Sequence, residues 1–258
     1  GIIFDLYRNI MHKLKAVFWD VDGTIADTEL CGHRVAFNLA FKDFDLDWNW
    51  NEGHYMDLLK ISGGYKRIIH YRNEVHSEIS DSQCSKIQSR KSFHYKNLIQ
   101  SGKIKVREGV FRLIDELSSN DIEQFIVTTS GRESLEPFLN TSLSSHIDHF
   151  SSVITYENVS NHKPYPDAYQ LALQLSQKSE VNCLAIEDSM NGVAAAKAAK
   201  LNCLLTLPPW KNSTNNITNK ANACVNSLGN LKHPSKVIYG KKLITSNVDF
   251  DYLTNIIN

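Results

Sequence analysis

The chain has 258 residues and no formal net charge, because 28 lysines and arginines balance 28 aspartates and glutamates. Hydrophobic residues make up 42% and charged residues 22%, which is ordinary for a globular protein and argues against a disordered or fibrous chain. A neutral chain has no global basic field for nucleic acid or an anionic membrane, so we expect neither as a partner. No apolar run approaches the roughly 18 residues of a membrane span.

The five cysteines are scattered and form no C-x-x-C pair. This pattern argues against a zinc site or a disulfide framework and predicts a reducing, cytoplasmic location. Residues 1–10 lack the basic start and the cleavage site of a signal peptide, so we interpret them as an extension before Met11. At about 150 residues per domain, the length predicts roughly two domains.

Short apolar runs that end at polar residues predict strands over residues 15–19, 122–128, 181–186 and 202–207, with a last short strand at 223–225. Helical spacing lies between these runs, over residues 108–117, 165–175 and 189–200. Strands that alternate with helices favour an α/β fold, with a doubly wound, Rossmann-like parallel sheet covered on both faces.

Residues 28–104 have a different pattern, with helical periodicity, many polar residues and no convincing strand. We interpret them as an all-helical domain inserted after the first strand. The α/β core then comprises residues 11–27 and 105–230, and residues 231–258 form a C-terminal tail that we expect to pack on the core. Trp48 and Trp50 are expected to pack inside the insertion.

The first predicted strand runs into Asp20-Val21-Asp22-Gly23-Thr24. Carboxylates two residues apart on an extended chain point the same way, so Asp20 and Asp22 can reach one small polar site. One carboxylate can attack phosphorus, and the other can protonate the leaving alcohol and then activate water. Two such charges need a cation, and oxygen ligands suit Mg²⁺. The motif alone also fits an ordinary Asp-Gly turn.

Three later segments carry side chains suited to a phosphoryl group. Thr128 and Thr129 end a strand, where hydroxyls and backbone N–H groups can hold phosphate oxygens or simply cap a helix. Lys163 is held among prolines, and its ammonium can offset transition-state charge or remain an exposed lysine. Glu187 and Asp188 end a buried strand, which indicates either a cation site, with Asp188 on the metal, or helix-dipole complementation.

These groups fall on four strand ends, which meet at one edge of an open parallel sheet. Their order resembles the four motifs of haloacid dehalogenase-superfamily hydrolases with a helical cap, over residues 15–207. The resemblance implies that Asp20 is the nucleophile and Asp22 the general acid and base. Dehalogenating members lack the second acid, so the presence of Asp22 favours phosphoryl transfer.

The resemblance also implies a ligand set for each part of the site. Mg²⁺ would be held by Asp20, the carbonyl oxygen of Asp22, and Asp188, with Glu187 and Asn191 around it. The transferring phosphoryl group would be held by Thr128, the backbone of Thr129, and Lys163.

The helical insertion resembles the cap of the CbbY-like group of this superfamily over residues 27–29, 32–38 and 58–68. Pro208-Pro209-Trp210, beyond the last core strand, also resembles that group. Characterised CbbY-like proteins hydrolyse xylulose-1,5-bisphosphate. The loop Ser62-Gly63-Gly64-Tyr65 departs from the three glycines and polar residue of that group, which affects fine specificity rather than the reaction.

The candidate substrate-binding residues of the cap are Glu29, His33, Gly63, Gly64, Lys66 and Arg67. Glu29 and His33 lie one helical turn apart and can hydrogen-bond sugar hydroxyls. The glycines let the backbone approach a ligand, and the two cations can meet a second phosphate. An ordinary turn and a solvated helix face are the alternatives.

The sequence therefore predicts a monomeric, cytoplasmic, Mg²⁺-dependent phosphatase that hydrolyses a small phosphosugar through an aspartyl-phosphate. Xylulose-1,5-bisphosphate or a related sugar bisphosphate is the expected substrate. The alternatives are a β-phosphoglucomutase-like mutase, a phosphoglycolate phosphatase and, from another class, a non-catalytic phosphometabolite sensor.

Overall fold

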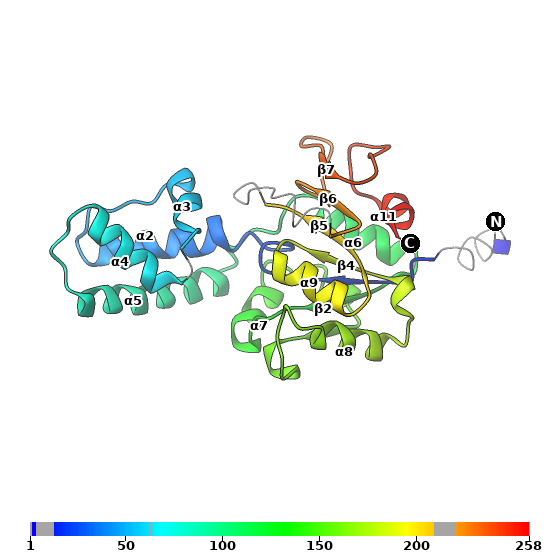
Figure 1. The fold of residues 1–258 in the computed structure, drawn as a ribbon, viewed down its shortest axis with the longest axis horizontal. Coiled ribbons are helices and arrows are strands. Elements are labelled where there is room, and N and C mark those ends of the chain that lie inside the picture. The colour runs from blue at the N-terminus through cyan, green and yellow to red at the C-terminus, as the bar shows by residue number, and fades with distance from the viewer. Residues whose placement is uncertain (1, 4–12, 62, 209–219, 258) are drawn as a thin grey trace.

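A computed structural model describes residues 2–3, 13–61, 63–208 and 220–257 (Figure 1). Most of the proposed extension over residues 1–10 therefore lies outside the described residues, as do Ser62, Pro209 and Trp210 of the motifs above. A sheet flanked by helices occupies one side of the molecule, and the helices α2–α5 extend from it on the other side.

Within the described residues, the sheet has seven strands in the order β3-β2-β1-β4-β5-β6-β7. Their bounds are β1 Ala16–Trp19, β2 Glu123–Val127, β3 Ser152–Ile154, β4 Cys183–Glu187, β5 Asn202–Thr206, β6 Ala223–Val225 and β7 Val237–Tyr239. Each neighbouring pair from β3 across β2, β1, β4 and β5 to β6 is parallel, and β7 pairs antiparallel with β6. The predicted parallel α/β fold is confirmed, and β3 and β7 are the two strands that the apolar runs did not predict.

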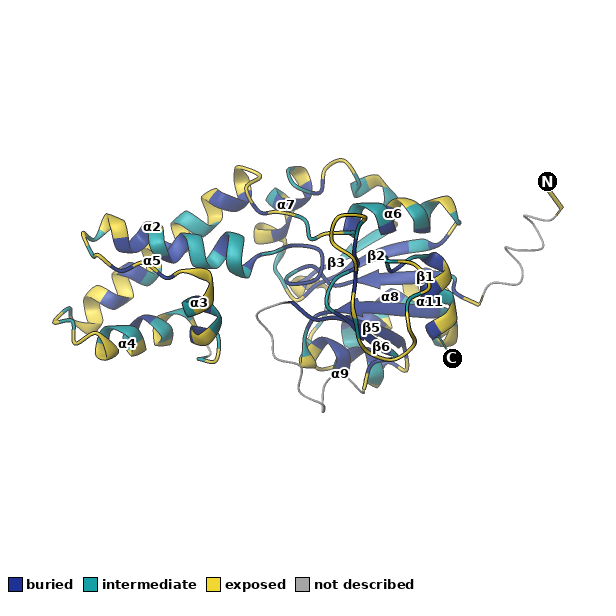
Figure 2. Ribbon diagram, turned by 90° about the horizontal axis from the view of Figure 1, so that it is seen from above, coloured by how far each residue is buried: buried dark blue, intermediate teal, exposed yellow. Residues whose placement is uncertain are grey.

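Helices cover both faces of the sheet because successive strand residues point to opposite sides. On one face, Val17 and Trp19 of β1 share an apolar cluster with residues of α6 (Val110–Ser119), α7 (Arg132–Asn140) and α11 (Phe250–Ile256). On the other face, Ala16 and Phe18 share a cluster with residues of α8 (Asp167–Ser176) and α9 (Met190–Ala198). The central strands are consequently buried on both sides (Figure 2).

Short helical turns and the C-terminal segment complete this part of the chain. The 3₁₀ turns are Ile147–His149, Tyr156–Asn158 and Glu180–Asn182. The C-terminal α11 lies against α6, where the Phe250 N–H donates to Glu116 Oε1 at 2.9 Å. Because Phe250 and Leu253 are buried in the same cluster as α6, this end of the chain adds to the core.

The helical group begins with a π-helical turn at Glu29–His33 and continues with α2 (Arg34–Asp43), α3 (Glu52–Leu58), α4 (Gly64–Glu74) and α5 (Asp81–Gln100). Its own apolar cluster contains aromatic residues from several segments, including Trp48 and Trp50. Trp50 is fully buried against Phe37 and Phe41. The expectation that these tryptophans pack inside the insertion is confirmed.

Two antiparallel segments join the helical group to the sheet. Ala26 and Val106 form an isolated bridge, the Asp27 N–H donates to the Lys105 carbonyl at 3.0 Å, and the Arg107 N–H donates to the Ile25 carbonyl at 2.8 Å. The chain therefore leaves and re-enters the sheet region through one paired connection. No helix in the described ranges is long and apolar enough to span a membrane.

Leu184→Ala tests whether β4 anchors the fold. Leu184 is fully buried, so we expect its truncation to lower the free energy of unfolding by about 2–5 kcal/mol. Leu175→Ala is the matched control, because Leu175 is 51% exposed on α8 and should cost less than about 1 kcal/mol. Urea denaturation measures both values, and equal losses would contradict a core centred on β4.

Candidate active site

The register of the sheet brings the polar strand ends together. Trp19, the last residue of β1, pairs with Ile126 of β2 and with Ile186 of β4. The pairing continues one residue further, because the Asp20 N–H donates to the Ile186 carbonyl at 3.1 Å. Asp20, Thr128 and Asp188 thus leave neighbouring strands at the same edge, as parallel topology requires.

Three buried carboxylates form the centre of the site. Ligand oxygens of Asp20, Glu187 and Asp188 all lie within 4.8 Å of one another. The Thr24 hydroxyl lies between two of them, 2.9 Å from Asp20 Oδ2 and 3.4 Å from Asp188 Oδ1. So much buried negative charge requires cations close by, and carboxylate oxygens are the ligands that Mg²⁺ prefers. The donor set therefore fits a divalent cation.

Lys163 supplies one positive charge to this group. Its Nζ lies 3.1 Å from Asp20 Oδ1 and 2.6 Å from Glu187 Oε1, and it donates to the Val127 carbonyl at 2.9 Å. Burial alone would lower the pKa of Lys163, but the charges of Asp20 and Glu187 raise it above its usual value. The ammonium is therefore permanently charged, and the alternative of an exposed lysine is wrong.

Tyr169 of α8 contacts the same oxygen of Glu187 as Lys163 does. Its hydroxyl donates to Glu187 Oε1, and Lys163 Nζ lies 5.0 Å from the centre of its ring. Burial and the charge of Asp20 raise the pKa of Glu187, while Lys163 and Tyr169 oppose that rise. Glu187 is thus oriented by two donors rather than by solvent.

Asp22 has surroundings that differ from those of the other acids. Its Oδ2 accepts a hydrogen bond from the Ser130 hydroxyl at 2.5 Å. Burial raises the pKa of Asp22 and the charge of Asp20 raises it further, although the Ser130 and Thr28 hydroxyls lower it. The net rise favours the protonated form more than in an ordinary aspartate, which suits a group that must donate a proton.

Two glycines make room for the carboxylates. A Cβ on Gly23, whose φ is +83°, would lie 2.1 Å from Asp188 Oδ2. A Cβ on Gly192 in α9 would lie 1.9 Å from Glu187 Oε2. No L side chain fits at either position without moving an acid, so both glycines are part of the geometry of the site.

The remaining core candidates differ in position. Thr128 is buried and its Oγ1 accepts from the Ser130 N–H at 3.0 Å, whereas Thr129 is exposed. Ser189 caps α9 by accepting from the Gly192 N–H at 3.1 Å. Asn191 is exposed on the first turn of α9, and no hydrogen bond joins it to the carboxylates in the described part of the chain.

The candidates at the start of the helical group form a second cluster. Glu29 Oε2 accepts from the Tyr55 hydroxyl at 2.9 Å, and His33 stacks on Tyr95 with ring centres 4.0 Å apart. His33 Nδ1 lies 2.8 Å from Nζ of Lys91. Burial lowers the pKa of His33 far below its usual value, and the charges of Lys91 and Arg67 lower it further. His33 is therefore neutral.

Lys91 of α5 is a buried cation. Burial lowers its pKa to about 8, which the charge of Glu29 partly offsets. Its Nζ also lies 4.8 Å from the ring centre of Phe37 and 5.1 Å from that of Tyr95. Burial raises the pKa of Tyr95, and the charges of Asp22 and Glu29 raise it further, so Tyr95 lies within electrostatic reach of Asp22.

The two glycines of the loop differ in their surroundings, and so do the side chains of Lys66 and Arg67. Gly63 has φ +93° with open space beside it, as the predicted loop requires, whereas Gly64 packs near Gln88. Arg67 Nε donates to the Ile61 carbonyl at 2.8 Å, so this side chain holds the backbone that precedes the loop. Lys66 is exposed.

Sequence reasoning missed several residues that complete these clusters: Ser130, Tyr169, Lys91, Tyr55 and Tyr95. Ser130 directly follows Thr128-Thr129, so its hydroxyl was a signal within the motif already selected. The others lie on helices with no distinctive local pattern, and only the tertiary structure brings them to the site.

Comparison with known proteins identifies the family. The haloacid dehalogenase-like hydrolase family matches residues 17–206. The protein CbbY of Rhodobacter capsulatus is 36% identical over 195 residues, which cover 75% of this chain and 86% of that protein. The crystal structure of CbbY from Rhodobacter sphaeroides with phosphate has 30% identity and a TM-score of 0.62, and the match covers 85% of this chain and 98% of that one.

A second structure of that protein is a point mutant in complex with xylulose-1,5-bisphosphate, with 29% identity, a TM-score of 0.62 and the same coverage. The family match and the CbbY relatives agree with the four strand ends described above. The chain therefore belongs to the haloacid dehalogenase-like hydrolase family, in its CbbY-like group, and is a phosphatase of that family.

Proposed function

We propose that the protein is a Mg²⁺-dependent phosphatase of a small sugar bisphosphate, with xylulose-1,5-bisphosphate as the favoured substrate. The observation that carries the proposal is the placement of Asp20, with Lys163 on Oδ1 and Thr24 on Oδ2 at the centre of a buried acidic group. The similarity to the mutant CbbY that binds xylulose-1,5-bisphosphate extends over 98% of that protein, which supports the substrate.

In the first step, a carboxylate oxygen of Asp20 attacks phosphorus and forms an acyl phosphate while the bond from phosphorus to the ester oxygen breaks. Asp22 gives its proton to the departing oxygen, so the sugar leaves as an alcohol. The raised pKa of Asp22 keeps this proton available for the step.

In the second step, the Asp22 carboxylate takes a proton from water, and the resulting hydroxide attacks the same phosphorus. The phosphorus–oxygen bond to Asp20 breaks, which releases phosphate and restores the carboxylate. Lys163, the Thr128 hydroxyl and the Thr129 backbone N–H would hold the phosphoryl oxygens throughout.

Asp20, the carbonyl oxygen of Asp22, and Asp188 would hold Mg²⁺, with Glu187 near it and Asn191 further out. When bound, Mg²⁺ supplies positive charge against the phosphoryl oxygens and the crowded acids. The chain's own part is to keep Asp20 and Asp188 in place, through Thr24 and the space left by Gly23.

The helical group, residues 28–104, would act as a cap that closes over the core of residues 11–27 and 105–230. The cap candidates Glu29, His33, Gly63, Gly64, Lys66 and Arg67 would bind the sugar and its second phosphate. The buried ammonium of Lys91 joins them, because its hydrogen bond to neutral His33 leaves donors for an anionic group. A cytoplasmic monomer remains part of the prediction.

The function is tested by phosphate release from a panel of esters, each with and without Mg²⁺. The panel comprises xylulose-1,5-bisphosphate, ribulose-1,5-bisphosphate, β-glucose-1-phosphate and phosphoglycolate. We expect a strong preference for xylulose-1,5-bisphosphate and loss of activity on adding EDTA. Conversion of β-glucose-1-phosphate to glucose-6-phosphate without phosphate release would instead establish a mutase. Binding without turnover would establish a sensor.

Asp20→Asn and Asp22→Asn test the assigned chemical roles. Each amide keeps the shape of the side chain but removes the nucleophile or the proton donor, so we expect kcat to fall by about 1,000-fold or more. The exposed Asp57→Asn on α3 is the matched control and should leave kcat unchanged. Phosphate release by Asp20→Asn at the wild-type rate would contradict the mechanism.

Lys91→Met tests the buried ammonium of the cap. We expect KM for xylulose-1,5-bisphosphate to rise by about tenfold or more, because a hydrogen bond to a charged group is worth about 1.5–3 kcal/mol. The wild-type KM should also rise above pH 8, where Lys91 loses its proton, and the variant should lack this rise.

The same variant should raise Tm at neutral pH, since it removes a charge whose burial is unfavourable. Lys86→Met, exposed on the same helix, is the control for both measurements. An unchanged KM in Lys91→Met would remove Lys91 from the substrate site.

A further inference from the structure

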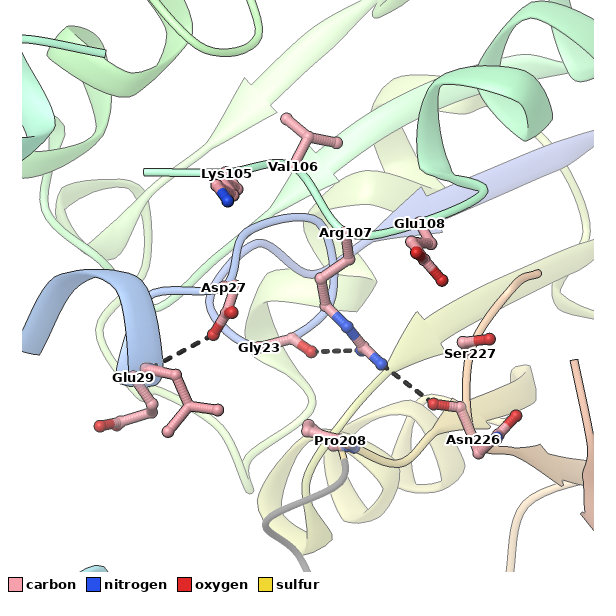
Figure 3. A pocket seen from close by; sticks show the side chains of 11 residues that line it. Gly23, Asp27, Glu29, Lys105, Val106, Arg107, Glu108, Pro208, Asn226 and Ser227 are labelled. Carbon is pink, nitrogen blue, oxygen red and sulfur yellow. Dashed lines mark hydrogen bonds between the residues drawn. The ribbon is translucent and has the colours of Figure 1, made fainter. Parts of the chain in front are cut away.

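Arg107 lies at the point where the chain returns from the helical group to the sheet. Its guanidinium donates to three backbone carbonyls, of Gly23 at 2.6 Å, Asn226 at 3.2 Å and Thr206 at 3.3 Å. Figure 3 shows the side chain reaching from the segment before α6 toward Gly23 on one side and Asn226 on the other. One side chain thus joins four separate segments of the chain.

The Gly23 carbonyl belongs to the loop that carries the proposed nucleophile. Gly23 lies between Asp22 and Thr24, and its Cα is so close to Asp188 that a Cβ would lie 2.1 Å from Oδ2. Thr24 in turn donates to Asp20. Any shift of the Gly23 peptide would therefore move the Thr24 contact and the spacing between Asp20 and Asp188 together.

The other two contacts of Arg107 supply a fixed reference for this loop. Thr206 ends β5, and Asn226 directly follows β6, so both carbonyls are fixed by the sheet. The Arg107 N–H also donates to the Ile25 carbonyl at 2.8 Å, which ties its backbone to the same loop. A planar guanidinium with several donors can hold three acceptors at once, whereas an ammonium on a flexible stem cannot fix their geometry.

Burial lowers the pKa of Arg107, while the charges of Asp188 and Asp27 oppose that shift. The guanidinium remains charged, because its usual pKa is so high. Its cleft, about 310 Å³ in volume, also contains Asp27, Glu29 and Lys105. Arg107 therefore lies between the connection to the cap and the acidic centre, but among its hydrogen bonds in the described ranges all acceptors are backbone carbonyls.

We propose that Arg107 is a positioning residue, which fixes the Gly23 peptide against the ends of β5 and β6 and so sets the spacing of Asp20 and Asp188. This proposal rests on the proposed function for its kinetic readout. Its geometric content can also be measured without turnover, through the binding of Mg²⁺ alone.

The test compares Arg107→Lys with Arg112→Lys. Arg112 is a matched control, because its guanidinium also donates to two backbone carbonyls, of Leu228 at 2.9 Å and Gly229 at 3.1 Å, but does not contact the Gly23 loop. Both substitutions keep the positive charge and remove the planar fork. Any difference between the variants therefore reports on the geometry of the loop.

We expect Arg107→Lys to lower kcat for p-nitrophenyl phosphate by about 10- to 100-fold with little change in KM, since small displacements of reacting groups have effects of this size. Its Kd for Mg²⁺, measured by calorimetry without substrate, should rise by about tenfold. Arg112→Lys should change neither value by more than about twofold. In Arg107→Ala, added guanidinium ion should restore part of kcat.

Equal losses in the Arg107 and Arg112 variants, in proportion to a loss of Tm, would make Arg107 a structural residue and overturn the proposal. Failure of both Arg107 variants to fold would do the same. If the wild-type protein released no phosphate from any ester, the proposed function would fail, and the Mg²⁺ measurement would still decide the role of Arg107. An unchanged Mg²⁺ Kd in folded Arg107→Lys would refute it.

Discussion

The close approach of three buried carboxylates at the ends of β1 and β4 is the constraint on which the rest of the site depends. Asp20, Glu187 and Asp188 have ligand oxygens within 4.8 Å of one another, where mutual repulsion and lost hydration both oppose the charged forms. The ammonium of Lys163 contacts Asp20 and Glu187, the Thr24 hydroxyl donates to the other oxygen of Asp20, and the Tyr169 hydroxyl donates to the Glu187 oxygen that Lys163 also contacts. The arrangement is stable only because these donors come from separate elements that the sheet holds in register.

Parallel pairing of the strands provides that register. The strands β2, β1 and β4 are largely buried on both faces, so most of their side chains are apolar and fix the alignment of the sheet. The residues just past their ends are then free to be polar. Gly23 and Gly192 show how narrow the tolerance is, since a single added carbon at either position would overlap a carboxylate oxygen.

The local sequence pattern predicts those strands, helices and site residues whose signal lies within a short stretch of the chain. The apolar runs identify five strands, whereas β3 and β7 have three residues each and are partly exposed, so their short apolar stretches do not stand out from the neighbouring sequence. The spacing of Glu29 and His33 predicts one α-helical turn, but the structure has a π-helical turn there, which local spacing does not distinguish. Lys91 has no local signal, because it lies on a largely polar helix and its burial arises only from packing against Phe37, His33 and Tyr95.

The contrast between local sequence signals and tertiary contacts also distinguishes the residues proposed for the reaction from those proposed for substrate binding. The groups proposed to react are concentrated at strand ends in short motifs, so the proposed chemistry can be predicted from spacing. The groups proposed to bind the sugar are spread over the π-helical turn Glu29–His33, α4 and α5, and their properties depend on tertiary contacts such as the hydrogen bond from Lys91 to His33. The two parts meet at the paired connection of Ala26 with Val106, where Arg107 also holds the Gly23 peptide. Because the segment that returns from the helical group shares these hydrogen bonds with the loop after Asp20, the position of the helical group depends on the position of that loop.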